Sequence, residues 1–172
     1  MKDLAFTFII CMSLVSFSSI SQQTQWNQTP SGSSLMVHGG TGLIQVPTSR
    51  MLDDGELILS YTDNNEYRFM SVTSQLFPWM QATVRYTDVR TQLYSNIESF
   101  SGDQTLKDKG IDAKFRLFQE SLYLPELSVG FRDFGGTGFF ESEFIGLSKQ
   151  FGPINFHLNM GWGYLGTNDN LS

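Results

Sequence analysis

The stretch that decides the fold is Ile154-Asn155-Phe156-His157-Leu158-Asn159-Met160-Gly161-Trp162-Gly163-Tyr164. Every even-numbered residue in it is large and apolar or aromatic, and every odd-numbered residue is polar or glycine. Strict alternation is typical of a β-strand with one apolar and one polar face. The run is long for a soluble strand, which usually has about 5 to 6 residues. Its length matches the roughly 9 to 11 residues of a transmembrane β-strand.

Weaker alternating stretches precede this one, and no window shows a convincing apolar repeat of 3.6 residues. In the stretch 80–87, for example, Met80, Ala82 and Val84 alternate with polar residues. The other candidate strands are 57–61, 67–76, 111–118, 127–134 and 142–150, with 43–46 as an optional further strand. The sequence therefore predicts an all-β fold, an antiparallel up-and-down meander of about seven or eight strands.

The predicted connections alternate in length. Phe77-Pro78-Trp79 and Phe151-Gly152-Pro153 are tight turns with aromatic residues beside them, whereas 88–110 is predicted to be a long polar connection. Short turns on one side, long loops on the other and aromatic residues at strand ends are typical of outer-membrane barrels. We therefore expect the meander to be part of an outer-membrane β-barrel, or a small one. The same alternation also describes a periplasmic β-sandwich or lipocalin-like barrel, in which the apolar face is the core.

Composition supports a β-protein and argues against nucleic acid as a partner. The 172-residue chain is 14% aromatic and only 16% charged, with 16 glycines. Chains rich in aromatic residues and glycine and poor in charge tend to be all-β. The net charge is −6 and no run of basic residues occurs, whereas nucleic-acid binding requires clustered cations.

The N-terminus has the features of a secretory signal peptide. Lys2 precedes the mostly apolar stretch 4–17, and Ser19 and Ser21 occupy the small-residue positions before a cleavage site. Cleavage there would remove Cys11, the only cysteine, and no small residue stands immediately before Cys11 to favour lipid attachment. The predicted organisation is a signal peptide over 1–21, a polar N-terminal extension over 22–41 and a β-barrel segment over 42–172.

No combination of residues indicates a catalytic or metal site. His38 and His157 lie in different contexts and form neither an HExxH motif nor an i, i+4 pair. Glu141 and Glu143 could place two carboxylates on one face, but no accompanying pocket residue supports a glycosidase pair. We therefore expect a protein that is not an enzyme and that holds no metal or cofactor.

If the strands cross a membrane, their two faces contact different surroundings. The polar positions expected to face the lumen are Arg85, Asp112, Lys114, Arg116, Asn155, His157 and Asn159. The aromatic residues expected to face lipid or the membrane interface are Trp79, Tyr86, Phe115, Phe156, Trp162 and Tyr164. Charged and amide side chains in a lumen could hydrogen-bond to sugar hydroxyl groups. The alternative for each polar position is a solvated place on the wet face of a sheet.

Two glycine segments, 39–42 and 135–138, lack the lysine and helix of a phosphate-binding loop, so turns or bulges explain them better. They lie within longer motifs, Gly40-Thr41-Gly42-Leu43-Ile44-Gln45-Val46-Pro47-Thr48-Ser49-Arg50 and Phe131-Arg132-Asp133-Phe134-Gly135-Gly136-Thr137-Gly138-Phe139-Phe140. Together with Phe144, Lys149 and Gly161-Trp162-Gly163-Tyr164-Leu165-Gly166, these motifs closely resemble the N-terminal region of the YjbH-type, or WbfB, family. The resemblance spans residues 40–166.

Members of that family are outer-membrane β-barrel proteins associated with exopolysaccharide or capsule operons. The resemblance therefore implies export to a Gram-negative outer membrane and a role in making or secreting surface polysaccharide. It implies outer-membrane lipid, polysaccharide and other envelope proteins of the same system as partners, and it carries over no catalytic residue. Family members are several times longer, so we expect this chain to be truncated at its C-terminus.

Two alternatives remain at this point. A periplasmic β-sandwich could bind glycan through exposed aromatic residues such as Trp79 and Trp162, which would then lie close together on one surface. A polysaccharide-modifying enzyme would need a carboxylate pair or a nucleophile that the sequence does not show.

Overall fold

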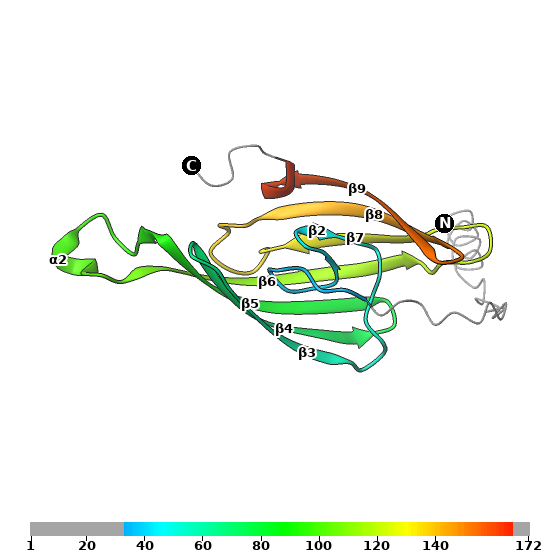
Figure 1. The fold of residues 1–172 in the computed structure, drawn as a ribbon, viewed down its shortest axis with the longest axis horizontal. Coiled ribbons are helices and arrows are strands. Elements are labelled where there is room, and N and C mark those ends of the chain that lie inside the picture. The colour runs from blue at the N-terminus through cyan, green and yellow to red at the C-terminus, as the bar shows by residue number, and fades with distance from the viewer. Residues whose placement is uncertain (1–32, 167–172) are drawn as a thin grey trace, which may run out of the picture.

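The computed structural model describes residues 33–166, and its main element is one antiparallel sheet of seven strands (Figure 1). Neighbours in sequence are neighbours in the sheet, in the order β3 to β9. The strands are β3 (Leu57–Asp63), β4 (Tyr67–Phe77), β5 (Met80–Leu93), β6 (Thr105–Phe118), β7 (Glu126–Arg132), β8 (Ser142–Phe151) and β9 (Ile154–Gly163). This confirms the predicted all-β meander. Within the described residues β3 and β9 do not pair with each other, so the sheet is open.

The alternating stretch at the C-terminal side forms the hairpin β8–β9. Its register is continuous from Phe151↔Ile154 at the turn to Ser142↔Gly163 at the far end. Gly152 in the turn has φ 57°, a left-handed conformation that glycine adopts without steric cost. The tight turn and the long strand are thus where the sequence predicts them.

The hairpin β5–β6 differs from the prediction of a long loop over 88–110. Both strands continue well past the rest of the sheet, and the connection is only 94–104, which includes α2 (Glu98–Ser101) (Figure 1). The extension pairs polar residues across the strands, for example Asp88 with Lys107, whose Nζ lies 2.5 Å from the Asp88 carboxylate. Only isolated apolar residues such as Val89 and Leu106 interrupt the polar residues here, so the sequence lacks the regular apolar alternation that marks the other strands.

Residues 33–52 form a compact segment, the plug, that packs on one face of the sheet. It contains a small hairpin of β1 (Gly42–Leu43) and β2 (Val46–Pro47), so the optional strand predicted over 43–46 is divided by a turn. Within the plug His38 and Thr41 are buried, although the sequence places both in a polar N-terminal extension. The predicted signal peptide and residues 22–32 lie outside the described residues.

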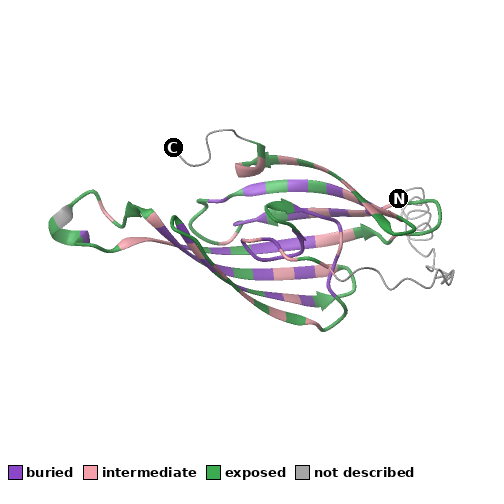
Figure 2. Ribbon diagram, viewed as in Figure 1, coloured by how far each residue is buried: buried purple, intermediate pink, exposed green. Residues whose placement is uncertain are grey.

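The two faces of the sheet are buried in the reverse of the usual order (Figure 2). The side chains under the plug, here called the polar face, are mostly hydrophilic, and the side chains on the opposite, apolar face are mostly exposed and hydrophobic. The polar face includes Ser71, Thr73, Gln75, Gln81, Thr83, Arg85, Thr87, Asp108, Asp112, Lys114, Glu126, Ser128 and Ser148. The apolar face includes Leu57, Leu59, Tyr61, Met70, Val72, Val84, Tyr86, Ile111, Phe131, Ile145, Phe156, Leu158, Met160 and Trp162.

The hydrophobic core is small and lies at the end of the sheet opposite the two tight turns. Tyr67, Phe69, Val89 and Phe140 are buried there, with Tyr67 and Phe69 stacked at a centroid distance of 5.6 Å. Tyr164 packs against this cluster, with its ring 5.0 Å from that of Phe140. The expectation that Tyr164 faces lipid is therefore wrong. The strand ends at Gly163, and the chain turns inward through the short 3-10 helix η1 (Tyr164–Gly166).

Candidate functional site

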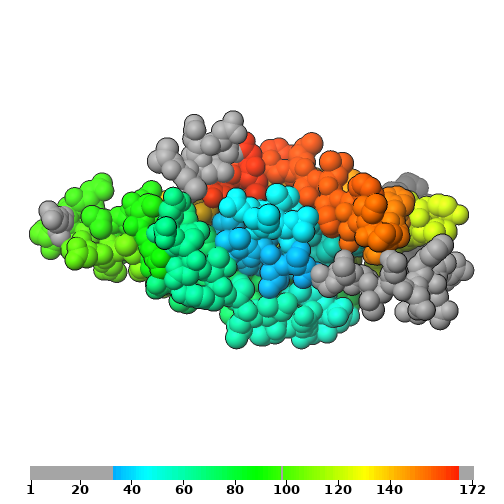
Figure 3. All heavy atoms as spheres, viewed as in Figure 1, coloured from blue at the N-terminus to red at the C-terminus, as the bar shows by residue number. Residues whose placement is uncertain are grey.

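The candidate site is the polar face together with the plug that occupies it. In Figure 3 the plug, coloured blue to cyan, fills the space between the strands at the two sides of the sheet. It hydrogen-bonds to six of the seven strands, from β4 to β9. The contacts join Gly40 to Thr73, Thr41 to Gln81 and Lys114, Arg50 to Glu126 and Asn155, and Ser49 to Ser148. One segment thus bridges strands that are distant from each other in the sheet.

Lys114 is the central anchor of the plug. It projects from β6, is 6% exposed, and its Nζ donates to Thr48 O at 3.1 Å and Arg50 O at 2.7 Å. The same ammonium donates to the carbonyl and the hydroxyl of Thr41. Backbone carbonyls from both ends of the β1–β2 hairpin therefore converge on one buried cation. Backbone carbonyl groups are strong acceptors that need hydrogen-bond partners when they are buried away from water.

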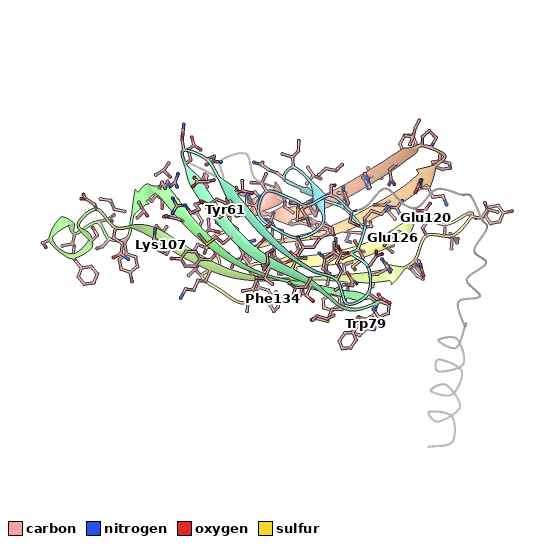
Figure 4. All side chains as sticks on the ribbon, turned by 60° about the horizontal axis from the view of Figure 1, so that its bottom comes forward. Tyr61, Trp79, Lys107, Glu120, Glu126 and Phe134 are labelled. Carbon is pink, nitrogen blue, oxygen red and sulfur yellow. The ribbon has the colours of Figure 1, made fainter. Side chains whose placement is uncertain are left out.

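Arg50 makes the second charged attachment. Its guanidinium lies 2.6 Å from the Glu120 carboxylate and 2.9 Å from that of Glu126, and it donates to Asn155 Oδ1 at 2.7 Å. Figure 4 shows the two carboxylates on neighbouring parts of the chain, close to the plug. Burial opposes ionisation of Glu120, but the Gln150 N–H and Arg50 outweigh it and hold its pKa below the ordinary value. Ion pairs therefore tie the plug to β7 and the 119–125 connection, and a hydrogen bond ties it to β9.

A buried charge cluster lies between the plug and the core. Arg85 is 1% exposed, and its guanidinium donates to both Asp112 oxygens at 3.2 and 3.0 Å. It also lies 4.0 Å from Asp133 and 5.3 Å from the centre of the Phe140 ring. Asp133 in turn accepts the Phe140 N–H at 2.8 Å. The cluster fixes the loop that follows β7 against the polar face.

Glycine is required where this loop approaches the sheet. A β carbon at Gly136 would stand 2.0 Å from the Lys109 carbonyl oxygen, and one at Gly110 would stand 2.6 Å from an Arg85 nitrogen. At Gly136 the segment 135–138 therefore serves close packing against the sheet, a role that the prediction of turns or bulges does not include.

His38 of the plug is buried among aromatic rings. Its ring centre lies 4.5 Å from that of Phe69 and 6.0 Å from that of Phe140. Burial, reinforced by the positive charges of Arg132 and Arg85, lowers the pKa of His38 to about 3. The imidazole is therefore neutral at physiological pH.

The polar residues predicted to face a lumen all lie on the polar face. Arg85, Asp112 and Lys114 are buried beneath the plug, and the others are partly exposed. Arg116 pairs with Glu126 at 2.7 Å, and the His157 ring bonds to the Ser148 hydroxyl at 2.8 Å. Asn155 contacts Arg50, while Asn159 Oδ1 has no partner within the described part of the chain.

Five of the six predicted lipid-facing aromatics lie on the apolar face or at its edge. Tyr86, Phe156 and Trp162 are exposed there. Trp79, in the β4–β5 turn, points away from the sheet (Figure 4) and stacks on Phe77 at 5.3 Å. Phe115 is partly covered by Trp79, at a centroid distance of 6.2 Å.

The register separates the two tryptophans that an exposed glycan site would need together. Trp162 lies opposite Glu143, and the pairing continues through Phe131 and Ala113 to Ala82 of β5. Four strand spacings separate β5 from β9, which is about 19 Å. Trp79, in the turn before β5, therefore lies four strands away from Trp162 and at the opposite end of the strands.

The apolar face ends in a belt of charge. Along β3, β4, β5 and β6 the row Tyr61, Met70, Tyr86 and Lys109 is followed by the row Asp63, Arg68, Asp88 and Lys107. Within this belt Arg68 donates to Asp63 at 3.2 Å, and an Arg90 nitrogen lies 2.8 Å from the same carboxylate. A groove of about 640 Å³ lies on the apolar side of the belt. Its lining includes Leu59, Tyr61, Met70, Val72, Val84, Tyr86 and Ile111.

Several residues of the site are absent from the sequence-based prediction. Arg50, Glu126 and Gln81 are central to the contacts of the plug, and Arg132 lies buried beside the charge cluster. Gln81, Glu126 and Arg132 occupy the polar phase of alternating strands, so the alternation could have identified them. Arg50 lies in a segment without periodicity, and no local signal places it on the sheet.

Within residues 33–166, no group of three or more histidine, cysteine, aspartate or glutamate residues could hold a metal ion. Glu143 lies on the apolar face and Glu141 in the turn before β8, both exposed. Over the same residues, no helix has both the length and the hydrophobicity needed to cross a membrane.

Comparison with known proteins places the chain in a family. A family model described as "Exopolysaccharide biosynthesis protein YbjH" matches residues 34–172. The chain is 56% identical over 142 residues to the Escherichia coli (strain K12) protein named "Uncharacterized lipoprotein YjbH". This match covers 83% of the chain and 20% of that relative, so the chain spans about a fifth of the relative's length. No solved structure matches the chain. The chain therefore belongs to the YjbH family of exopolysaccharide biosynthesis proteins.

Proposed function

We propose that the chain is part of an outer-membrane β-barrel that helps exopolysaccharide to assemble at, or cross, the cell envelope, and that it is not an enzyme. The observation that carries this proposal is the reversed burial of the two faces. Exposed hydrophobic side chains follow every strand on one face, while Arg85 and Lys114 are buried on the other. Monomeric soluble proteins rarely expose contiguous apolar patches larger than a few hundred Å². In a membrane, the hydrophobic side chains of this face would contact lipid acyl chains and would not be exposed to water.

The dimensions of the apolar face agree with a membrane. The apolar residues of β9 run from Ile154 to Trp162, eight residue steps or about 27 Å along the strand. This is comparable to the apolar band of about 25 Å on outer-membrane barrels. Aromatic residues at the tight turns and the charged belt at the opposite end would lie at the two interfaces. The groove beside Tyr61 and Tyr86 would be filled by acyl chains.

The open edges have a place in this proposal. Within residues 33–166, β3 and β9 each present unpaired backbone groups on one side, which lipid does not tolerate. Further strands would pair with these edges and close the barrel around the polar face. The lumen would then carry hydroxyl, amide and charged groups that can hydrogen-bond to a polysaccharide. Other envelope proteins of the exopolysaccharide system would be its partners.

The alternative of a periplasmic glycan-binding sandwich has less support. A sandwich would cover the apolar side of the sheet with a second layer, yet the plug covers the polar side. Clustered aromatic residues would form its binding surface, whereas Trp79 precedes β5 and Trp162 lies on β9, four strand spacings or about 19 Å across the sheet.

Membrane fractionation tests the proposal directly. We expect the protein in the outer membrane after washing with alkali or urea, and released only by detergent. In vesicles containing brominated lipid, the fluorescence of Trp162 should be quenched, and the Trp162→Phe variant should lose that part of the quenching. Recovery in the soluble periplasmic extract without detergent would remove the membrane assignment.

The non-enzymatic assignment has its own test. Purified protein incubated with the polysaccharide of its own cell should produce no new reducing ends or other bond cleavage. Cleavage that requires the intact protein would overturn this part of the proposal.

Export to the envelope can be examined at the mature N-terminus. The relative is named a lipoprotein, and Cys11, outside the described residues, is the one cysteine of this chain. We propose cleavage after Ser21, which gives a mature chain that begins unmodified at Gln22. Mass spectrometry of the mature protein separates this from lipid attachment at Cys11, and the Cys11→Ser variant should reach the same membrane.

A further inference from the structure

We propose that the plug is a movable gate, which leaves the polar face so that polysaccharide can pass. This inference rests on the proposed function, because a gate requires a conduit. It concerns the regulation of the conduit and assigns that role to residues 33–52. Three features support it: the polar contacts between the plug and the polar face, the buried polar groups of that face that lack hydrogen-bond partners, and the backbone strain within the plug.

The plug is held on the sheet by many polar contacts, and at one end Val37 and His38 also pack against the small hydrophobic core. Lys114, Gln81, Thr73 and Ser148 bond to it across the polar face, and Arg50 adds the ion pairs at one end. A net hydrogen bond contributes only about 0.5 to 1.5 kcal/mol, because water offers comparable partners when the bond opens. Sugar hydroxyl groups offer such partners too. A polysaccharide could therefore replace the plug on this face group for group.

The plug does not provide hydrogen-bond partners for all buried polar groups of the polar face. Gln75 Oε1, Gln81 Nε2, Ser128 Oγ and Asn159 Oδ1 are buried on the polar face and have no partner within residues 33–166. The Ser49 hydroxyl of the plug is in the same state. A permanent core usually satisfies nearly all of its buried polar groups. These groups fit a surface that also has to bind something other than the plug.

The plug carries backbone strain and exposed apolar side chains at its tip. Ile44 has φ 54°, a left-handed conformation that is rare for a β-branched residue. Its side chain is 76% exposed, and Leu43 and Val46 beside it are also exposed. Strained backbone of this kind costs about 1 to 3 kcal/mol and is frequent in switch segments.

A disulfide between plug and sheet can lock the gate. A β carbon at Gly146 would stand 3.1 Å from Ser49 Oγ, and Gly146 has no positive φ that would exclude a side chain. The Ser49 β carbon is one bond from that oxygen, so the two β carbons lie at most about 4.5 Å apart, within disulfide range. The new side chain would displace Asn159 Oδ1, the end of a side chain, at 2.5 Å. Ser49→Cys with Gly146→Cys should therefore cross-link in the oxidising periplasm.

The matched control is a disulfide that leaves the plug free. Leu59 and Val72 face each other across β3 and β4 on the apolar face, away from the plug, so Leu59→Cys with Val72→Cys staples two strands of the sheet. Each cysteine pair is introduced into the full protein, which is expressed in its own cell after deletion of the wild-type gene. Surface polysaccharide and outer-membrane level are measured with and without reductant.

We expect the plug lock to reduce surface polysaccharide to the level of the deletion strain and reductant to restore it, while the control pair exports normally. Normal export with the plug disulfide formed would overturn the gate. If the deletion strain itself exports normally, the proposed function fails instead, and the two failures are thus distinguishable.

A second variant keeps the gate testable if the double-cysteine protein does not reach the membrane. Arg50→Ala removes the ion pairs to Glu120 and Glu126 and should loosen the plug. The expected result is increased entry of a large antibiotic such as vancomycin at an unchanged protein level. Unchanged entry would contradict the gate.

Discussion

The polar and apolar faces of this sheet differ in what covers them. The polar face, with Arg85 and Lys114, lies beneath a folded segment, while the apolar face, with Leu158 and Met160, is uncovered. In water the opposite arrangement is favoured, because burial of apolar surface contributes roughly 25 cal/mol per Å². The comparison teaches that alternation defines two faces, whereas the surrounding medium decides which of them is inside.

The largest expected effect is on the buried charge of the polar face. Arg85→Ala removes the guanidinium that donates to both Asp112 oxygens and should lower the free energy of unfolding by about 3 to 5 kcal/mol. Denaturant unfolding of the protein in detergent micelles measures this loss. The double variant Arg85→Met with Asp112→Leu removes both charges and should recover part of it. Equal losses in the single and double variants would show that charge pairing is not what holds this face.

A charge on the other face should also be costly, but only in a membrane. Leu158 lies in the middle of β9 and is 71% exposed. Leu158→Arg should destabilise the lipid-inserted protein by about 2 to 4 kcal/mol, as for basic residues at the midplane of other barrels. Unfolding in lipid vesicles measures the effect, and Leu158→Met is the matched control. If Leu158→Arg is neutral in lipid, the apolar face does not contact acyl chains.

The sequence predicts this pair of faces well, because a period of two is a local property of each strand. From Ile154 to Trp162 the side chains alternate between the two faces as the sequence predicts, and Lys114 and Arg85 lie on the polar face as expected. Tyr164 departs because the left-handed Gly163 ends the strand and turns the chain inward.

The plug could not be predicted in the same way. Its contacts join residues far apart in the chain, such as Arg50 with Asn155, and its backbone follows no regular period. Only the fold of the whole sheet shows that the glycine-rich segment before Arg50 lies on the polar face. The extension of β5 and β6 could not be predicted for a related reason, because apolar residues such as Val89 and Leu106 are too few there to form a regular alternation.

Acid should weaken the covered face selectively. The pKa of His38 falls from 6.5 to about 3 on folding, so below pH 6.5 the unfolded state takes up a proton that the folded state does not. Stability therefore declines as the pH falls from about 6.5 towards 3, by up to about 1.4 kcal/mol for each pH unit. His38→Phe keeps an aromatic ring beside Phe69 and removes this proton. The difference in unfolding free energy between the two proteins should be flat above pH 7 and grow in acid; a pH-independent difference would show that His38 does not titrate in this way.

The smallest expected effect marks where the apolar face ends. Lys107 lies on the same side of β6 as Ile111, but beyond the boundary, where its partner Asp88 also lies. The pair is partly exposed, and such pairs contribute about 0 to 1 kcal/mol. Lys107→Ala should therefore change the free energy of unfolding by less than about 1 kcal/mol. Ile111 lies four residues further along β6, closer to the middle of the sheet, and Ile111→Lys should destabilise the protein more in lipid than in detergent. Equal effects of the two changes in lipid would mean that the charged belt does not mark the edge of the membrane, because a charge would then be tolerated equally on both sides of it.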